Sequence, residues 1–335
     1  SAQMWAGFPA GDARMHFKET KDWIPSMGVK YALGVDGVAL PLVALTCFLG
    51  PLVVLVSWKS VKTGVKEFHV AVLFLQSAMV GVFCARDLFL FYVFWEAMLV
   101  PMYLLIGVWG GDRRVYAAVK FFVYTMVGSL LMLVAIIVVY WKAWKTFDVE
   151  LISARLALDV GLQKWLFGAF ALAFLIKVPM FPFHTWLPDA HTEAPTAGSV
   201  VLAGVMLKMG TFGFLRYAIP WFPAALDAFW WLLAALSIVG IVYGALMCLA
   251  QDDMKKLIAY SSVSHMAFVM LGILAMNEQA VQGAVLQMVN HGLSTGALFL
   301  LIGMIYERTH TRHIEDYGGL AKIAPRYATL FVIVT

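Results

Sequence analysis

Nine apolar runs of about 20 residues dominate this sequence, and most are separated by only short polar connections. A run of this length is what an α-helix needs to cross the hydrocarbon core of a bilayer. Inside the bilayer every backbone N–H and C=O must be bonded internally, so such runs fold as helices. The sequence therefore predicts an all-α, polytopic integral membrane protein. The expected spans are residues 38–57, 69–85, 88–108, 116–141, 165–190, 197–215, 226–250, 257–275 and 282–306.

The low charge content supports this class and excludes others. Only 13% of the 335 residues are charged and 62% are apolar, whereas soluble domains carry about 25% charged residues. The net charge of +4 includes no block of basic residues, so we expect no nucleic-acid partner. Cys47, Cys84 and Cys248 lie singly in apolar stretches and predict neither a disulfide framework nor a metal site.

The two ends of the chain differ from its middle. Residues 1–37 form a polar N-terminal segment without a signal-peptide pattern, and residues 38–335 form the expected transmembrane domain. A tenth apolar run begins near Tyr327 and stops at Thr335, too short to span, so we expect an internal fragment of a longer protein. The loops after odd-numbered spans hold more Lys and Arg than the others, which predicts that they face the cytoplasm.

Three ionisable residues, Glu96, Lys177 and Lys208, lie near the middle of expected spans. A charge at this depth costs about 3 kcal/mol on insertion scales, and pairing, hydration or loss of the charge must offset that cost. Lys177 is the partner for Glu96 that lowers the cost of both charges. Buried lysines gain and lose protons readily, so Lys208 is a candidate relay. The pattern indicates a protein that moves charge through the membrane.

The fifth expected span contains a break. Pro179 and Pro182 each remove a backbone donor and clash with the preceding turn, and Lys177 lies directly before them. The freed carbonyls need protein or water as partners, and broken helices of this kind form ion sites in transporters. The structural alternatives are a Lys177 that snorkels to the membrane edge, a permanently protonated Glu96, and a Lys208 that caps carbonyls of a neighbouring helix.

Two histidines extend this series. His265 lies in the eighth span one turn after hydroxyl residues, and His291 follows Gln287 and Asn290 in the ninth. A neutral histidine has one donor and one acceptor and can relay a proton. The alternative is a pair of hydrogen-bonded core residues. Lys120 lies nearer a helix end, where we expect it to snorkel to the membrane surface.

No pattern predicts a bound metal or cofactor in this chain. The pairs His184 with His191 and His310 with His313 lack the third and fourth ligands of a structural zinc site. The sequence has no glycine-rich phosphate loop, nucleophile elbow or cysteine cluster. Any redox chemistry linked to this chain is expected elsewhere.

Three stretches resemble the antiporter-like subunits of respiratory complex I. They are Phe89–Tyr103, Lys177–Ser199 and Asp253–Met266. The stretch Tyr306–Leu320 and the segment Lys120–Thr125 resemble the M-type subunits of that family, which have a mitochondrial counterpart. The resemblance implies an antiporter-like helix bundle with two inverted five-helix repeats, each containing a broken transmembrane helix.

The same resemblance places the first repeat at about residues 69–219 and a truncated second repeat at about residues 226–335. The second broken helix and the terminal ionisable residue of the family would lie beyond Thr335. Two helices would precede the first span.

The resemblance also assigns roles to the buried residues. Glu96 and Lys177 would govern proton uptake, Lys208 would be the next relay, and His265 and His291 would form the hydrated axis beyond it. The implied function is a proton-translocating membrane subunit of an NADH:quinone oxidoreductase. Flavin, iron–sulfur clusters and quinone would belong to partner subunits, with none in this chain.

The implied surroundings are the lipid bilayer and neighbouring antiporter-like subunits. The bacterial cytoplasmic membrane is favoured, with the mitochondrial inner membrane as the alternative. Two other functions stay open: a subunit of a sodium/proton antiporter or membrane-bound hydrogenase, and a scaffold that transports nothing.

Overall fold

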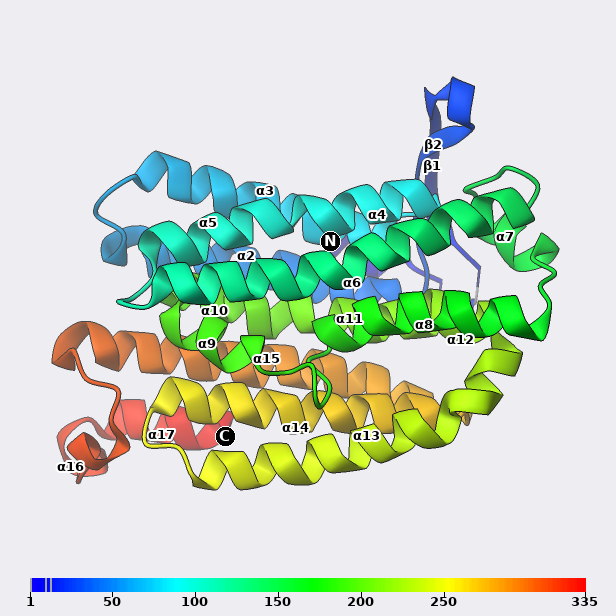
Figure 1. Ribbon diagram of the computed structural model, residues 1–335. Helices are drawn as coiled ribbons and strands as arrows, with labels where there is room; N and C mark the ends of the chain where they lie inside the picture. The colour runs from blue at the N-terminus through cyan, green and yellow to red at the C-terminus, as the bar shows by residue number, and fades with distance from the viewer. Residues whose placement is uncertain (1, 10, 13) are drawn as a thin grey trace.

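A bundle of long helices forms most of the computed structural model, which describes residues 2–9, 11–12 and 14–335. Within these residues, nine helical stretches are long and apolar enough to cross a membrane. They lie side by side along one common direction (Figure 1). The predicted all-α membrane fold is therefore confirmed. The long helices are α2 (Ala39–Ser60), α3 (Val65–Cys84), α4 (Leu88–Ala97) with α5 (Leu99–Trp109), α6 (Arg114–Lys142), α8 (Val160–Lys177), the stretch Thr196–Trp221, α13 (Pro223–Leu249), α14 (Met254–Leu274) and α15 (Glu278–Thr309).

Acidic and amide side chains begin several of these helices. Asp87 accepts hydrogen bonds from the backbone N–H groups of Phe89 and Leu90, and Asp253 accepts them from Lys255 and Lys256. These bonds satisfy backbone donors that have no partner within the helix. Asp148, Asp159 and Asn277 cap the short helix α7 (Val149–Arg155), α8 and α15 in the same way.

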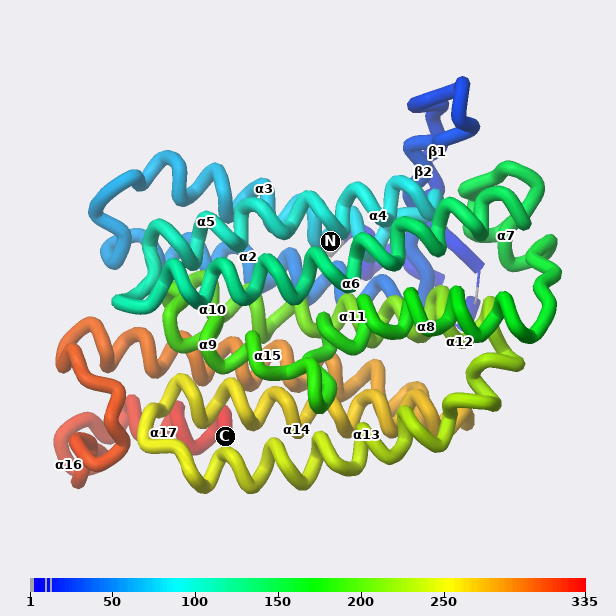
Figure 2. The backbone as a smooth tube through the Cα atoms, viewed as in Figure 1, coloured from blue at the N-terminus to red at the C-terminus, as the bar shows by residue number. Residues whose placement is uncertain are grey.

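The predicted break in the fifth span is present. Helix α8 ends at Lys177, a loop follows, and the chain becomes helical again in α9 (Trp186–Glu193). The backbone tube shows this loop as an excursion in the middle of the bundle (Figure 2). The expected span 165–190 is thus two helices, and the first of them starts earlier than predicted, at Val160.

The next stretch, Thr196–Trp221, is almost entirely buried at the centre of the bundle. It is not a uniform α-helix. The α-helical pieces α10 (Thr196–Val201), α11 (Leu207–Gly213) and α12 (Ile219–Trp221) alternate with π-helical turns at Leu202–Met206 and Phe214–Ala218. Turns of this kind occur often at functional sites.

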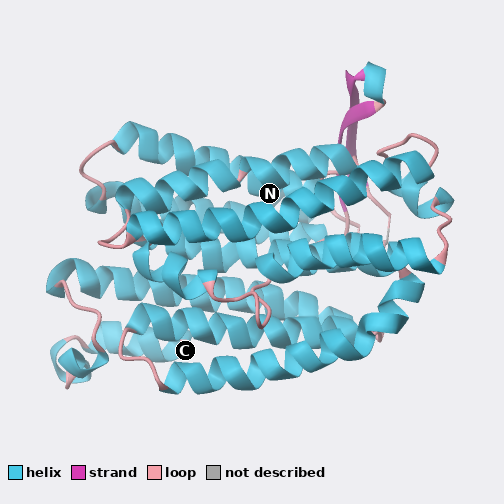
Figure 3. Ribbon diagram, in the orientation of Figure 1, coloured by secondary structure: helices cyan, strands magenta, loops and turns pink. Residues whose placement is uncertain are grey.

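The N-terminal segment contains a β-hairpin that the sequence analysis did not predict. Strand β1 (His16–Ile24) pairs antiparallel with β2 (Val29–Val35), and Gly28 takes a left-handed φ of 68° in the connection. Figure 3 shows the strands in magenta, projecting at one end of the bundle. The hairpin is anchored where Arg86 N donates to Ala32 O, 2.9 Å away.

Short helices complete the described chain. Helix α1 (Ala2–Gly7) precedes the hairpin, and α16 (Leu320–Ile323) follows α15. Helix α17 (Pro325–Val334) corresponds to the tenth apolar run expected near Tyr327.

Candidate functional site

Lys208 is the centre of a polar cluster inside the bundle. It lies on α11 between the two π-helical turns, and 0% of its surface is exposed. Its Nζ donates to the carbonyl of Ala203 and lies 2.7 Å from Nδ1 of His291 on α15. The ammonium of Lys208 therefore has a carbonyl and an imidazole as neighbours.

Glycines allow the helices that carry Lys208 and His291 to approach closely. A Cβ atom at Gly292 would lie 2.7 Å from the carbonyl oxygen of Gly204, on the π-helical turn before Lys208. Only glycine permits backbones to meet at this separation. This close approach brings His291 within hydrogen-bonding distance of Lys208.

His265 adds a third group to this cluster. Its ring lies on α14, with its centroid 5.8 Å from that of His291. His291 is buried, whereas His265 is exposed on the surface of this chain. The structure thus brings together three of the five predicted site residues, in the order Lys208, His291, His265.

Glu96 and Lys177 do not form the direct ion pair that we predicted. Among the described residues, no oxygen of Glu96 comes within 4.0 Å of the Lys177 ammonium. The ammonium instead lies 5.2 Å from the ring centroid of Trp95 and 5.8 Å from that of Phe121. Aromatic rings, and no paired carboxylate, therefore lie beside the Lys177 ammonium among the described residues.

Both residues nevertheless lie where their helices are interrupted. Lys177 is 2% exposed at the last turn of α8, and Oε1 of Glu96 is buried without a hydrogen-bond partner among the described atoms. Glu96 lies one residue before the end of α4, and Pro101 in the first turn of α5 leaves one backbone carbonyl there without its usual donor.

Lys120 has a partner that the sequence analysis missed. Its Nζ lies 2.7 Å from Oδ2 of Asp189 on α9. The prediction that Lys120 snorkels to the membrane surface did not include this partner, and the snorkelling itself stays a prediction. Periodicity along α6 contains no information about a carboxylate 69 residues later in the chain.

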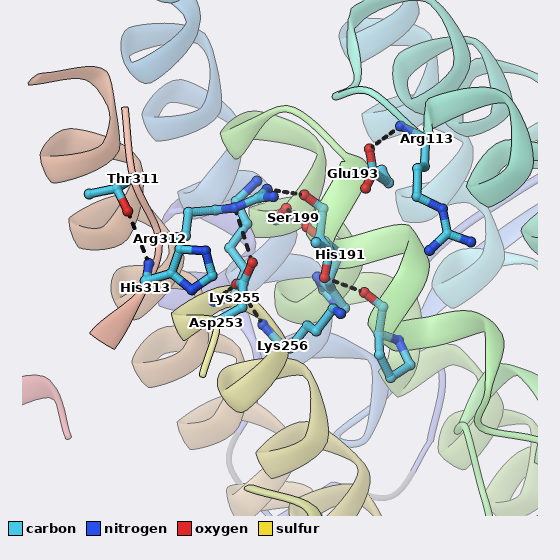
Figure 4. Close-up of polar contacts among 12 residues, drawn as sticks. Arg113, His191, Glu193, Ser199, Asp253, Lys255, Lys256, Thr311, Arg312 and His313 are labelled. Carbon is cyan, nitrogen blue, oxygen red and sulfur yellow. Dashed lines mark hydrogen bonds and ion pairs between the residues drawn. The ribbon is translucent and has the colours of Figure 1, made fainter. Parts of the chain in front are cut away.

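A second polar cluster joins α9 to α14 and to the loop after α15 (Figure 4). Arg312 Nε lies 3.1 Å from Oδ2 of Asp253, and Arg312 Nη1 donates to Thr192 O at 2.7 Å. Lys255, only 4% exposed, donates from Nζ to Ala194 O at 2.8 Å. We call these residues the end cluster. The sequence analysis did not predict this cluster, because its members come from segments far apart in the chain.

His184 and His191, for which the sequence predicts no metal site, are buried and pack against aromatic rings. His184 lies with its ring centroid 5.0 Å from that of Tyr243, and His191 stacks on Phe299 at 4.7 Å. The described residues contain no group of three or more His, Cys, Asp or Glu side chains placed to hold a metal ion.

Comparison with known proteins adds the family. A family model described as "NADH:quinone oxidoreductase/Mrp antiporter, TM" matches residues 85–335. The chain belongs to this family. A second model, "NADH-ubiquinone oxidoreductase chain 4, amino terminus", matches residues 15–82 of this antiporter-like chain.

The individual relatives with high sequence identity are M-type subunits and their chain 4 counterparts. NADH-quinone oxidoreductase subunit M of Rhodobacter capsulatus is 51% identical over 346 aligned residues, covering 100% of this chain and 67% of the relative. NADH-ubiquinone oxidoreductase chain 4 of Marchantia polymorpha is 44% identical, covering 99% of this chain and 67% of the relative. The chain thus spans about two thirds of the length of these relatives.

The fold has the same relatives. A chain of respiratory complex I from Thermus thermophilus superposes with a TM-score of 0.87 at 38% identity, covering 95% of this chain and 67% of that one. The family and the nine apolar helices of the described part together establish an integral membrane protein. The roles of individual site residues, the division into repeats and the membrane orientation stay predictions.

Proposed function

We propose that this chain is a proton-translocating membrane subunit of an NADH:quinone oxidoreductase, in which protons move along Lys208, His291 and His265. The 2.7 Å contact between Lys208 Nζ and His291 Nδ1 carries the proposal. An ammonium is a donor and a neutral imidazole nitrogen an acceptor, so the contact is one across which a proton can pass. The matched M subunits and the complex I structure support this reading.

The environment of Lys208 does not hold a proton permanently on its ammonium group. In the described residues no carboxylate forms an ion pair with Lys208, so no fixed anion holds its proton in place. Burial in a medium of low polarity disfavours the charged form of any lysine. His291 is buried as well, so burial disfavours the charged form of both groups and neither is a permanent resting place for a proton.

Glu96 and Lys177 act on this path through charge. At an effective dielectric constant of 20, unit charges separated by more than 4 Å interact by less than about 4 kcal/mol. Such an interaction is strong enough to bias protonation of Lys177 but does not fix the two side chains together. Helix α11 contacts α8 in the turn that precedes Lys177, since a Cβ atom at Gly210 would lie 2.6 Å from Phe174 O. A change in charge at Lys177 therefore acts on the neighbouring Lys208 segment.

The redox chemistry that drives this transfer would lie in partner subunits holding flavin, iron–sulfur clusters and quinone. The chain itself would contact neighbouring antiporter-like subunits and the lipid bilayer. We place it in a bacterial cytoplasmic membrane, because the relative with 51% identity is bacterial. The mitochondrial inner membrane is the alternative.

Replacement of Lys208 by methionine tests the proposal. We expect Lys208→Met to abolish or strongly reduce protons moved per NADH oxidised, measured in proteoliposomes containing the intact complex. The matched control is Lys142→Met, since Lys142 is an exposed residue in the last turn of α6. Assembly of both variants is checked by native electrophoresis. Unchanged proton stoichiometry in an assembled Lys208→Met complex would contradict the proposal.

A sodium/proton antiporter is the second candidate, since the family model covers Mrp antiporters as well. Affinity purification of the tagged chain separates the two. Copurifying flavin and iron–sulfur subunits that oxidise NADH support the oxidoreductase, whereas copurification of membrane subunits alone supports the antiporter.

A further inference from the structure

A cavity of about 660 Å³ opens beside the end cluster, where α2, α5 and α15 all end. The loops at this end are those whose Lys and Arg content predicts a cytoplasmic position. Its wall includes Lys255, Arg312 and Glu193, all three of which are labelled in Figure 4. The cavity lies apart from the Lys208 cluster, and no step of the proposed function uses it.

The walls of this cavity carry an excess of positive charge. Five cationic side chains line it, against the two carboxylates of Glu193 and Glu307. Three of the five cations are exposed and form no ion pair within the described residues. These three, which we call the rim cations, are Lys59, Lys62 and Arg114.

Among the described residues neither Glu193 nor Glu307 forms an ion pair with a rim cation. Oε2 of Glu193 accepts a hydrogen bond from the backbone N–H of Arg113 at 2.9 Å. Arg312 has Asp253 as its counter-ion, and Lys255 is bonded to a backbone carbonyl. The unbalanced charge of the cavity therefore lies at its rim, where a ligand from outside the chain meets it first.

Aromatic residues hold the rim in place at the level of the helix ends. Trp109 closes α5, and its Nε1 donates to Thr63 O at 2.8 Å, which fixes the loop that follows Lys62. Tyr306, in the last turns of α15, lines the opposite wall. Tryptophan and tyrosine gather at membrane–water interfaces, so the cavity lies at headgroup depth.

An apolar stripe leads from the cavity along α5 toward the middle of the span. Val108 lines the cavity, and Leu104 and Val100 follow at intervals of four residues on the same helix face. All three side chains are exposed, by 53%, 40% and 57%. A soluble anion makes no use of such a stripe, whereas an acyl chain attached to a headgroup in the cavity lies directly along it.

We propose that this cavity binds an anionic phospholipid, with its phosphate on the rim cations and one acyl chain along Val100, Leu104 and Val108. Basic pockets between transmembrane helices on the cytoplasmic side are suited to anionic headgroups. The proposal does not depend on proton transfer through Lys208. Its failure would therefore leave the proposed function intact, and the reverse also holds.

Photolabelling of the intact complex tests the site. The complex is placed in phosphatidylcholine nanodiscs containing a small fraction of phosphatidylglycerol with a photoreactive group on one acyl chain. We expect labelling of the peptide that contains Val100–Val108. Each cation near a membrane surface contributes about a fivefold factor in affinity for anionic lipid, so Lys59→Ala/Lys62→Ala/Arg114→Ala should reduce labelling at least about tenfold.

The matched control is Lys66→Ala/Arg308→Ala/Lys322→Ala, which removes three exposed cations from α3, α15 and α16, at the same end of the bundle but outside the cavity lining. We expect this variant to label like the unaltered complex. Equal labelling of the site variant and the control would overturn the proposal. Competition by inorganic phosphate as effective as that by unlabelled phosphatidylglycerol would indicate a soluble-anion site and would also overturn it.

Discussion

The Lys208 cluster and the end cluster are both built from buried lysines, but their partners differ in kind. In the end cluster, Arg312 pairs with a carboxylate but its guanidinium stays protonated, and Lys255 donates to a backbone carbonyl, which does not take up its proton. In the Lys208 cluster the lysine also touches an imidazole, which can accept one. The comparison teaches that burial of a cation alone does not indicate transport. The partner decides whether the cation is held in one state or can exchange its proton.

The largest expected effect comes from separating Lys208 from His291. In Gly292→Ala the new Cβ would lie 2.7 Å from Gly204 O and 2.5 Å from a methyl group of Leu45. Because a backbone carbonyl cannot yield as a side chain does, we expect a loss of about 3 kcal/mol of stability and of most proton pumping. Thermal unfolding of the purified complex and pumping in proteoliposomes measure both.

Gly283→Ala is the matched control on the same helix, since a Cβ atom there meets nothing within 4 Å. We expect this variant to behave like the unaltered protein. Pumping retained in Gly292→Ala would show that the Lys208–His291 contact is not needed.

A smaller effect is expected in the end cluster. Arg312→Gln leaves Asp253 without its cation and weakens the bond to Thr192 O. We expect a loss of about 1–3 kcal/mol in stability, with protons per NADH unchanged in the complex that assembles. A double-mutant cycle with Asp253→Asn should show coupling between the two sites. A changed proton stoichiometry would show that the end cluster also takes part in proton transfer, contrary to the distinction between the two clusters.

The smallest effect is expected at Lys120. Its pair with Asp189 has side chains that are 20% and 29% exposed, so solvent screens the attraction. Lys120→Met should therefore cost less than about 1 kcal/mol, with the loss reduced further at high salt. A loss of stability several times larger, measured by thermal unfolding, would mean that this pair behaves as a buried ion pair that solvent does not screen.

The sequence was sufficient for the features set by local length and composition. The nine spans follow from runs of about 20 apolar residues, and the break after Lys177 follows from Pro179 and Pro182. Lys208, His265 and His291 stood out because polar residues are expensive in such runs. The structure places His291 directly beside Lys208 and His265 next to His291, while their roles stay predictions.

Contacts between distant segments could not be predicted in this way. The pair of Lys120 with Asp189 and the bond from Arg312 to Thr192 join residues 69 and 120 positions apart. The expected Glu96–Lys177 ion pair is not formed among the described residues, where Lys177 lies beside the Trp95 ring, and side-chain positions at that precision are not readable from hydropathy. The β-hairpin was missed because the charged residues of β1 concealed its extended structure.

Because π-helical turns flank Lys208, the direction in which its side chain points depends on how the helix is wound. Each such turn holds one more residue than an α-turn, and one residue corresponds to a rotation of about 100° around the helix axis. If the turn at Leu202–Met206 rewound as α-helix, the segment beyond it would rotate and Lys208 would face a different neighbour. The contact between Lys208 and His291 thus depends on the π-helical winding, and rewinding as α-helix would break it without any separation of the helices themselves.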